Sequence, residues 1–184
     1  QKNCTTASGN TSVGSNSLLE NVEGLSNTAV GATALSLNLG SYNTAVGAGA
    51  LQDNDNAERN SAFGYESLFS QTTATPANNS AFGYKSATSN TIGTGLSSFG
   101  SNSLLNNEDG NYNSAFGYLS QSENVNGSNN SSFGYNSLNL NNASGNTAIG
   151  AGSMSASTTG ENNTAVGILS LSSNETGESN CAFG

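Results

Sequence analysis

A single short pattern recurs along the whole chain. Residues 27–35 read NTAVGATAL, and residues 43–51 read NTAVGAGAL. Similar segments follow one another at steps of 16 or 17 residues, with one step of 19, and each holds a Gly at the same place, called the closing Gly below. Self-similarity at a short fixed period is the signature of a repeat architecture. We therefore expect residues 1–184 to form a single repeat domain with eleven copies, whose closing Gly residues are Gly14, Gly31, Gly47, Gly64, Gly83, Gly100, Gly117, Gly134, Gly150, Gly167 and Gly184.

The residues just before each closing Gly alternate in size. Ala or Ser stands two positions before it, and Val, Ile or Phe stands immediately before it. Alternation with period two is typical of a β-strand whose faces meet different environments, and the Gly, Asn and β-branched content disfavours a helix. We predict that the larger residues form a core ladder, consisting of Val13, Val30, Val46, Phe63, Phe82, Phe99, Phe116, Phe133, Ile149, Val166 and Phe183.

The rest of each repeat predicts a return path. Three and four residues after the closing Gly come Ser or Ala and then usually Leu, as in Ser17 and Leu18, which we expect to form the opposite wall of the core. Seven residues before the closing Gly another Gly recurs, for example Gly24 and Gly40. Gly at this place predicts a tight corner with positive φ. Each repeat is thus predicted to run as strand, turn, short strand and turn.

Repeats of 16 or 17 residues are too small to bury a core alone, but they can stack as rungs of a parallel β-solenoid. Equivalent residues would then lie about 4.8 Å apart along a rod of roughly 50 Å. Asn stands four residues before the closing Gly in ten of the eleven rungs, and Leu96 replaces it in the other. These Asn predict either a ladder of side-chain amides or an Asn-favoured turn entry; they are Asn10, Asn27, Asn43, Asn60, Asn79, Asn113, Asn130, Asn146, Asn163 and Asn180.

Aromatic residues are correlated across the closing Gly. Where Phe precedes it, Tyr usually follows, as in Phe63 with Tyr65 and Phe82 with Tyr84. The Tyr residues could form a stripe that stacks on sugars or on protein, or a ladder that fills the core or a subunit seam. We favour the ladder because Phe lies beside Tyr.

Composition and charge exclude several functions. The net charge is −9 with only three basic residues, so the chain repels phosphate and nucleic acid is not expected as a partner. No apolar run approaches the roughly 18 residues of a membrane helix, and no membrane insertion is expected. The chain has no His and two Cys, so we expect no catalytic residue, no metal and no cofactor. Asp53 and Asp55 could form a carboxylate pair for glycoside hydrolysis, but their Asn-rich surroundings favour solvated turn residues.

The 19-residue step lies near the middle of the predicted rod, and the two Cys lie at its ends. Residues 71–79, with Pro76 where the corner Gly is expected, predict an outward loop. Cys4 and Cys181 lie in the first and last rungs, on the order of 48 Å apart in a solenoid, too far for a disulfide within one chain. They either are free buried thiols or join neighbouring molecules, and we hypothesise a head-to-tail crosslink of Cys181 with Cys4.

The segments NTAVGAGAL, NSAFGYESL and NTAIGAGSM resemble repeats of bacterial and phage surface fibres, including tail-fibre-type proteins and the β-roll heads of trimeric autotransporter adhesins. This resemblance implies a left-handed parallel β-roll, often trimeric, that is displayed outside the cell or on the virion surface. It also implies a role in adhesion or as a fibre shaft.

We therefore expect a non-enzymatic extracellular structural or adhesive fibre subunit that self-assembles by stacking of its rungs. Its expected partner is itself, head to tail or as a trimer, with a host or matrix protein or a glycan as a further partner. The alternatives are an ice- or carbohydrate-binding β-solenoid, which needs a flat outward face of Thr and Ser hydroxyls, and the receptor-binding segment of a trimeric phage tail fibre or adhesin.

Overall fold

The chain forms a parallel β-solenoid in a computed structural model that describes residues 6–72 and 76–184. One sheet of eleven parallel strands follows chain order from β1 to β11, and no helix occurs within the described ranges. The strands are β1 (Thr11–Val13), β2 (Thr28–Val30), β3 (Thr44–Val46), β4 (Ser61–Phe63), β5 (Ser80–Phe82), β6 (Ser97–Phe99), β7 (Ser114–Phe116), β8 (Ser131–Phe133), β9 (Thr147–Ile149), β10 (Thr164–Val166) and β11 (Cys181–Phe183).

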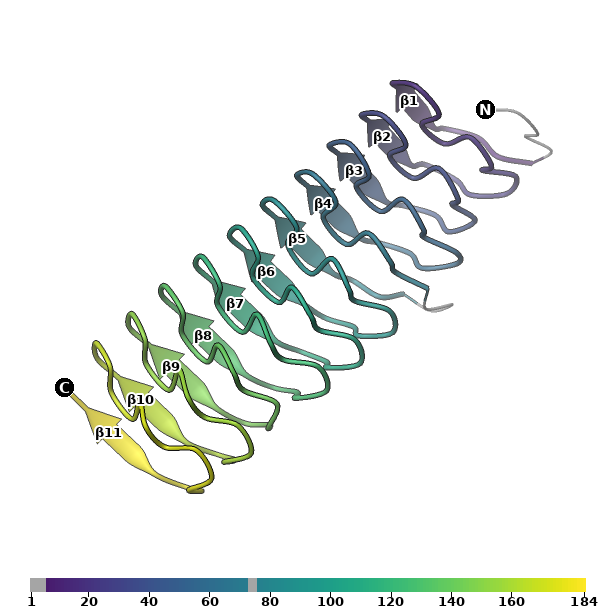
Figure 1. The fold of residues 1–184 in the computed structure, drawn as a ribbon. Coiled ribbons are helices and arrows are strands. Elements are labelled where there is room, and N and C mark those ends of the chain that lie inside the picture. The colour runs from purple at the N-terminus through teal and green to yellow at the C-terminus, as the bar shows by residue number, and fades with distance from the viewer. Residues whose placement is uncertain (1–5, 73–75) are drawn as a thin grey trace.

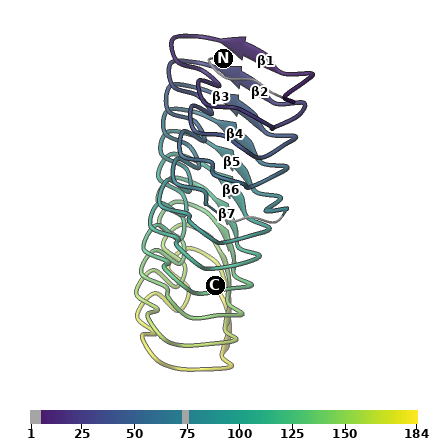
Figure 2. The same ribbon diagram turned by 90° about the vertical axis from the view of Figure 1, so that its right-hand side faces the viewer.

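The rungs stack in strict register. Thr28 of β2 pairs with Thr44 of β3, and every later strand pairs with the next at the same repeat position. The coils have nearly the same outline from end to end, and the sheet runs along one side of the rod (Figures 1 and 2). The predicted parallel β-solenoid architecture is therefore confirmed. In the part of the chain that the structure describes, no helix is long and apolar enough to span a membrane.

Each strand is only three residues long because the closing Gly turns the chain. The closing Gly of β6, Gly100, has φ of 145°, a region that residues with a Cβ rarely adopt. A Cβ on Gly100 would also meet the carbonyl group of Gly117 on the next rung. The corner is therefore tight in two respects, conformational and steric, and every closing Gly from Gly14 to Gly167 shares both, whereas Gly184 shares only the positive φ.

The predicted core ladder was assigned to the wrong face of the sheet. The small residue in the middle of the strand is the one that points inward, and Ala29, Ala45 and Ala62 are fully buried. The larger residues lie on the outer face: Phe133 is 41% exposed and Ile149 42%. The reason is the narrow cross-section of a 17-residue coil, in which a Leu from the opposite wall leaves room only for Ala or Ser. This correction applies to the outward column as a whole, namely Val13, Val30, Val46, Phe63, Phe82, Phe99, Phe116, Phe133, Ile149, Val166 and Phe183.

The opposite wall is made of Leu as predicted, but not by a second strand. Leu18, Leu35 and Leu51 are fully buried, and burial of one such side chain stabilises the fold by about 2 kcal/mol. Their φ values are 48° to 50°, so this segment is a run of turns. The backbone still bonds from rung to rung, as in Leu18 N–H to the Ala34 carbonyl at 3.1 Å. Left-handed backbone at Leu gives the wall its sharp curvature.

One core position departs from this rule. Gln121 is fully buried at the place where Leu104 and Leu138 lie in neighbouring rungs. Its amide nitrogen donates to the Ser114 carbonyl at 3.1 Å and to Ser132 Oγ at 2.8 Å. Its amide oxygen has no partner among the described residues. The apolar core is consequently divided into one cluster that includes Leu104 and another that begins at Leu138.

The Asn column expected before the strands is present, but its bonds run from side chain to backbone. Asn43 Oδ1 accepts the backbone N–H of Asn60 at 2.9 Å, and its Nδ2 donates to the Ala57 carbonyl at 2.8 Å. The same pattern joins Asn130 to Asn146 at 2.9 Å. A ladder of amide-to-amide bonds was predicted for this column, and only the bond from Asn180 Nδ2 to Asn163 Oδ1, at 3.0 Å, has that form among the described residues of the column.

A second amide column lies seven residues after the closing Gly, and here the side chains do bond to one another. Asn38 Nδ2 donates to Asn21 Oδ1 at 3.1 Å, and Asn54 Nδ2 donates to Asn38 Oδ1 at 2.6 Å. Further members are Gln71, Asn90, Asn107, Asn124, Asn141 and Asn174. The Asn side chains of this column also bond to the corners. The Asn21 amide, for example, donates to the carbonyl of the corner Gly beside it. The two columns together pair many of the polar groups of the solenoid interior, although Asn54 Oδ1, Asn60 Nδ2 and Asn124 Oδ1 have no partner among the described residues.

The corner Gly residues were predicted to have positive φ, and this was wrong. Gly24 and Gly40 are absent from the positive-φ residues of the described chain. They are small for a different reason: a Cβ on Gly24 would strike the Asn21 amide oxygen and the Gly40 carbonyl. The corner is filled by the two Asn columns, which leave no space for a side chain.

The predicted loop at residues 71–79 lies partly outside the described residues, because residues 73–75 are not described. Its flanks keep the solenoid pattern. Pro76 forms a parallel bridge with Glu58, and the Ala77 N–H donates to the Glu58 carbonyl at 3.1 Å. Asn79 then resumes the first Asn column by accepting the Leu96 N–H at 2.9 Å.

Candidate binding face

The outer face of the sheet carries two columns of side chains. The first residue of each strand is Thr or Ser, except Cys181, and the third is Val, Ile or Phe. Both columns are partly exposed in the inner rungs, whereas the middle residue is buried. Thr accompanies Val or Ile from β1 to β3 and in β9 and β10, and Ser accompanies Phe from β4 to β8.

Five Phe rings form a continuous stack on this face, over β4 to β8. The centroid of Phe63 lies 4.6 Å from that of Phe82, and Phe82 lies 4.7 Å from Phe99. The remaining steps, to Phe116 and Phe133, are 4.9 and 4.8 Å, and every pair is within 7° of parallel. Since each inner ring has a neighbour on both faces, the Phe column presents ring edges to the solvent rather than flat stacking surfaces.

A column of Tyr runs beside the Phe stack, one position after the closing Gly. Tyr65 and Tyr84 stack at 5.5 Å, and Tyr118 and Tyr135 stack at 5.9 Å. The rung between these two pairs has Ser101 in place of Tyr. Tyr84 and Tyr118 are each 50% exposed. The Tyr column is therefore interrupted once, at Ser101, and Tyr84 and Tyr118 are the rings next to the interruption. We call the five Phe and the four Tyr the aromatic band.

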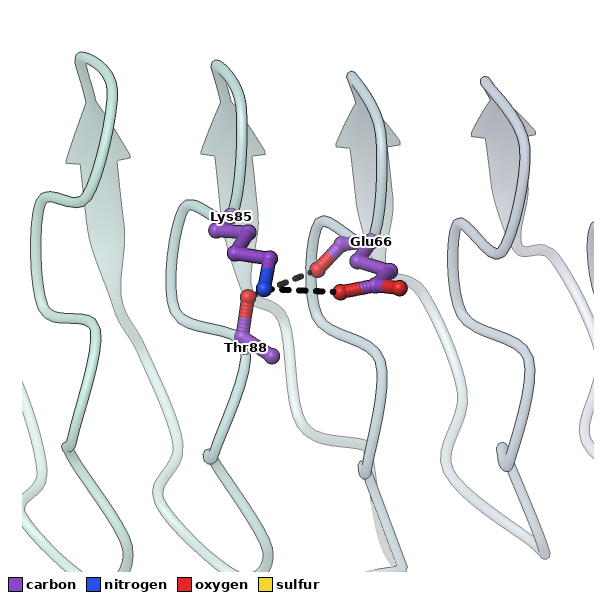
Figure 3. Close-up of polar contacts among 3 residues, drawn as sticks. All are labelled: Glu66, Lys85 and Thr88. Carbon is purple, nitrogen blue, oxygen red and sulfur yellow. Dashed lines mark hydrogen bonds and ion pairs between the residues drawn. The ribbon is translucent and has the colours of Figure 1, made fainter.

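Two charged residues border the aromatic band. Lys85 Nζ lies 3.3 Å from Glu66 Oε2 on the preceding rung, and Thr88 Oγ1 donates to the Glu66 backbone carbonyl at 2.8 Å (Figure 3). Hydrogen bonding with Tyr65 is the main cause that lowers the pKa of Glu66, with a further contribution from Lys85. The same contacts to Glu66 raise the pKa of Tyr65 and the pKa of Lys85. The charges of Lys85 and Glu66 thus neutralise each other, so the pair leaves no net charge beside the aromatic band.

The other acidic residues lie away from the sheet. No strand contains a charged residue in the described chain, whereas acidic side chains such as Glu20, Glu108 and Asp109 are exposed on the turns. Most of the net charge of −9 is therefore carried by the turns. A partner that approaches the sheet meets an uncharged surface.

The carboxylate pair singled out from the sequence lies in an open concavity on the turn side. Asp53 and Asp55 line a cavity of about 350 Å³ with Leu37 and Thr72. A neighbouring cavity of about 230 Å³ shares Leu37 and Asp55 and adds Glu20. Asp55 is exposed and Asp53 half-buried, as expected of solvated turn residues. No group of three or more potential metal ligands occurs among residues 6–72 and 76–184.

Of the two cysteines, the structure describes one. Cys181 is an exposed free thiol at the start of β11. Cys4 lies outside the described residues, so the predicted crosslink of Cys181 with Cys4 stays a prediction.

Comparisons of the chain with protein-family models, with curated proteins and with solved structures found no match.

Proposed function

We propose that this chain is a non-enzymatic structural segment of an extracellular fibre, displayed on a cell or a virion, in which solenoid rungs stack into a rod. The observation that supports the proposal is that every rung is complementary to a copy of itself. The proposal also includes assembly between chains through the same contacts.

The complementarity lies in the backbone groups at the two edges of a rung. The first residue of each strand donates its N–H to the following rung, as Thr11 does to the Asn27 carbonyl at 2.8 Å. The closing Gly of that following rung donates back, as Gly31 does to the Val13 carbonyl at 2.8 Å. The same two bonds recur up to Thr164 and Gly184. We call the edge of a rung that faces the following rung its forward edge, and the edge that faces the preceding rung its rear edge. Because all rungs use one pattern, the forward edge of any rung fits the rear edge of any other.

At β11 this pattern directs the Cys181 N–H away from β10. An exposed strand edge with unpaired N–H and carbonyl groups is a template for a further strand. In the proposed assembly, the rear edge of a second molecule pairs with this edge through the same two bonds. The exposed thiol of Cys181 lies on the same edge, where a crosslink would reinforce the contact.

The lateral surface suits a fibre exposed to solvent. The acidic turns keep neighbouring rods apart by charge repulsion, while the uncharged sheet face stays available for contacts. Thr or Ser hydroxyls do point outward, as an ice-binding face requires, but the Phe rings of β4 to β8 divide the Thr positions into two short groups. A continuous Thr array is therefore absent from the described sheet, and in the middle rungs the Ser hydroxyls stand beside large Phe rings, so we do not propose ice binding.

Electron microscopy and sedimentation of the purified chain test the proposal. Wild-type protein should form rods of constant width whose lengths are multiples of roughly 50 Å, the length of eleven rungs at about 4.8 Å each. The variant Cys181→Pro removes the N–H at the open edge of β11 while sparing the bonds of β11 with β10, and it should yield single-length rods. Cys181→Ser is the matched control, because it removes only the thiol and should still assemble.

Single-length wild-type rods at high concentration would contradict the proposal, and so would multiples that persist in Cys181→Pro. A non-reducing gel on the same samples tests the crosslink separately. If that gel shows only monomer, the disulfide is excluded but the stacking is not.

A further inference from the structure

We infer that the interruption of the Tyr column at Ser101 is a binding slot for one pyranose ring of a neutral glycan, held between Tyr84 and Tyr118. This inference depends only on the local geometry of three rungs and does not rest on the assembly of fibres.

The three residues occupy consecutive steps of one column. The Asn102 N–H donates to the Tyr84 carbonyl at 2.9 Å, and the Leu119 N–H donates to the Ser101 carbonyl at 3.2 Å. These bonds fix Tyr84, Ser101 and Tyr118 at the same position of successive coils. Where a ring is present at this position, it stacks on its neighbour, as Tyr65 does on Tyr84 at 5.5 Å and 12°. Ser101 is the only one of the five consecutive residues in this column that has no ring.

The width of the interruption matches one ring. The two Phe–Phe steps that flank the same rung are 4.7 and 4.9 Å, which places Tyr84 and Tyr118 about two steps, or roughly 10 Å, apart. A ring inserted midway would have its centre about 5 Å from each Tyr. Stacked rings in proteins have centroids about 4.5–7 Å apart, so both Tyr faces can contact one inserted ring. Two inserted rings would not fit.

The Tyr faces that border the slot are the free faces of the two pairs. Tyr84 is stacked on Tyr65, and Tyr118 on Tyr135, so each uses its other face toward Ser101. Lys85 Nζ lies 5.7 Å from the centre of the Tyr84 ring, and its side chain extends toward Glu66 on the preceding rung, away from Ser101 (Figure 3). The 50% exposure of both Tyr agrees with open access from the solvent.

The chemistry of the slot favours a neutral sugar. The aromatic faces are electron-rich and attract the C–H groups of a pyranose. The rim is polar but uncharged: it consists of the hydroxyl of the half-buried Ser101 and the two phenol groups. A few placed polar groups beside an apolar wall are what orient a small ligand. Among the residues that the structure describes, the cation near the slot is Lys85, which is engaged by Glu66, and the chain carries a charge of −9, so an anionic sugar would be repelled.

The test uses soluble hexasaccharides as probes: cellohexaose, maltohexaose and hexa-N-acetylchitohexaose, with an anionic hexagalacturonate for comparison. The chain has six Tyr and no Trp, so its intrinsic fluorescence reports Tyr directly. At least one neutral hexasaccharide should change Tyr fluorescence in a saturable manner, with an affinity on the order of millimolar for a single ring. The hexagalacturonate should bind at least 10-fold more weakly.

Substitutions locate the site. Ser101→Tyr completes the column with a residue that the neighbouring rungs already accommodate, and it should weaken binding at least 10-fold without loss of the fold. Ser101→Ala keeps the slot open and should retain binding within about threefold. Ala151→Tyr is a matched control, because it adds a ring at the same repeat position next to Tyr135 but leaves the slot unfilled, and it should bind as the wild type does.

Three results would overturn the inference. The first is binding that survives Ser101→Tyr, and the second is no response to any neutral hexasaccharide. The third is self-association of the wild type by sedimentation that Ser101→Tyr abolishes, since the slot would then hold a ring from a second copy of the chain. Fibre length by electron microscopy should be the same in all three variants, which separates this test from that of the proposed function.

Discussion

Replacement of the buried Gln121 by Leu should stabilise the protein. Gln121 separates the two apolar clusters of the solenoid core, and its amide oxygen has no partner within the described residues. The backbone offers no obstacle to Leu: φ is 52° at Gln121, 48° at Leu104 and 50° at Leu138. The substitution would therefore unite the core by a residue that the neighbouring rungs already hold in the same conformation.

The magnitude follows from three contributions. Removal of a buried unpaired acceptor gains about 1–3 kcal/mol, and the added apolar burial gains about 1–2 kcal/mol. The two hydrogen bonds from the Gln121 amide nitrogen, to the Ser114 carbonyl and to Ser132 Oγ, are lost at about 1 kcal/mol each. Ser132 keeps its bond with Ser120, which limits this loss. The free energy of unfolding should rise by up to about 3 kcal/mol.

Urea denaturation followed by far-ultraviolet circular dichroism measures this change. The midpoint of Gln121→Leu should shift upward with an unchanged slope, because the slope reports the surface exposed on unfolding. Gln121→Ala is the control: Ala87 occupies the equivalent position with φ of 52°, so the backbone tolerates Ala, but Ala leaves a cavity that Leu fills. Leu and Ala variants of equal stability, or a Leu variant no more stable than the wild type, would refute the reasoning.

Three further predictions concern the rungs and the charged pair. Asn43→Ala should lower the free energy of unfolding by about 2–4 kcal/mol, because the Asn60 N–H and the Ala57 carbonyl lose buried partners. As a control, Asn56→Ala at an exposed position should change the free energy of unfolding by less than about 0.5 kcal/mol. Equal effects of the two substitutions in urea denaturation would argue against the Asn column. Gly100→Ala should cost about 3 kcal/mol or more, since it combines strain at φ of 145° with a contact on the Gly117 carbonyl, and a wild-type urea midpoint would contradict this. Nuclear magnetic resonance titration should place the pKa of Glu66 below its ordinary value of 4.5, and Tyr65→Phe should raise it again. Ionised Glu66 therefore stabilises the fold above about pH 4.5, and this contribution is lost as the pH falls through the lowered pKa; an unchanged pKa in Tyr65→Phe would show that the hydrogen bond is not its cause.

The stacking could be predicted from the sequence because one period governs the whole chain. Equivalent residues of a parallel solenoid must lie above one another, so the alignment of Thr28 with Thr44 follows from counting alone. The second amide column was also visible in the sequence, as Asn or Gln seven residues after most closing Gly, for example Asn38 and Gln71. It was missed because Asn in a turn is common for local reasons.

The orientation of the strand could not be read from alternation. Period two predicts that Ala45 and Val46 point to opposite faces but does not say which face is inside. The volume of the opposite wall decides the matter, since Leu51 fills the coil and leaves room only for Ala. The left-handed φ of Leu51, 48°, was equally hidden, because residues with branched apolar side chains rarely adopt it. It is imposed by the closure of the coil.

The strict equivalence of the rungs has a genetic consequence. Segments as similar as NTAVGATAL and NTAVGAGAL are encoded by similar stretches of DNA, which can recombine out of register. Loss or gain of one whole repeat by such an exchange would leave every remaining residue above its counterpart and would change the rod by a single step of about 4.8 Å. Selection can thus adjust the length of the rod one repeat at a time, without an intermediate whose protein misfolds.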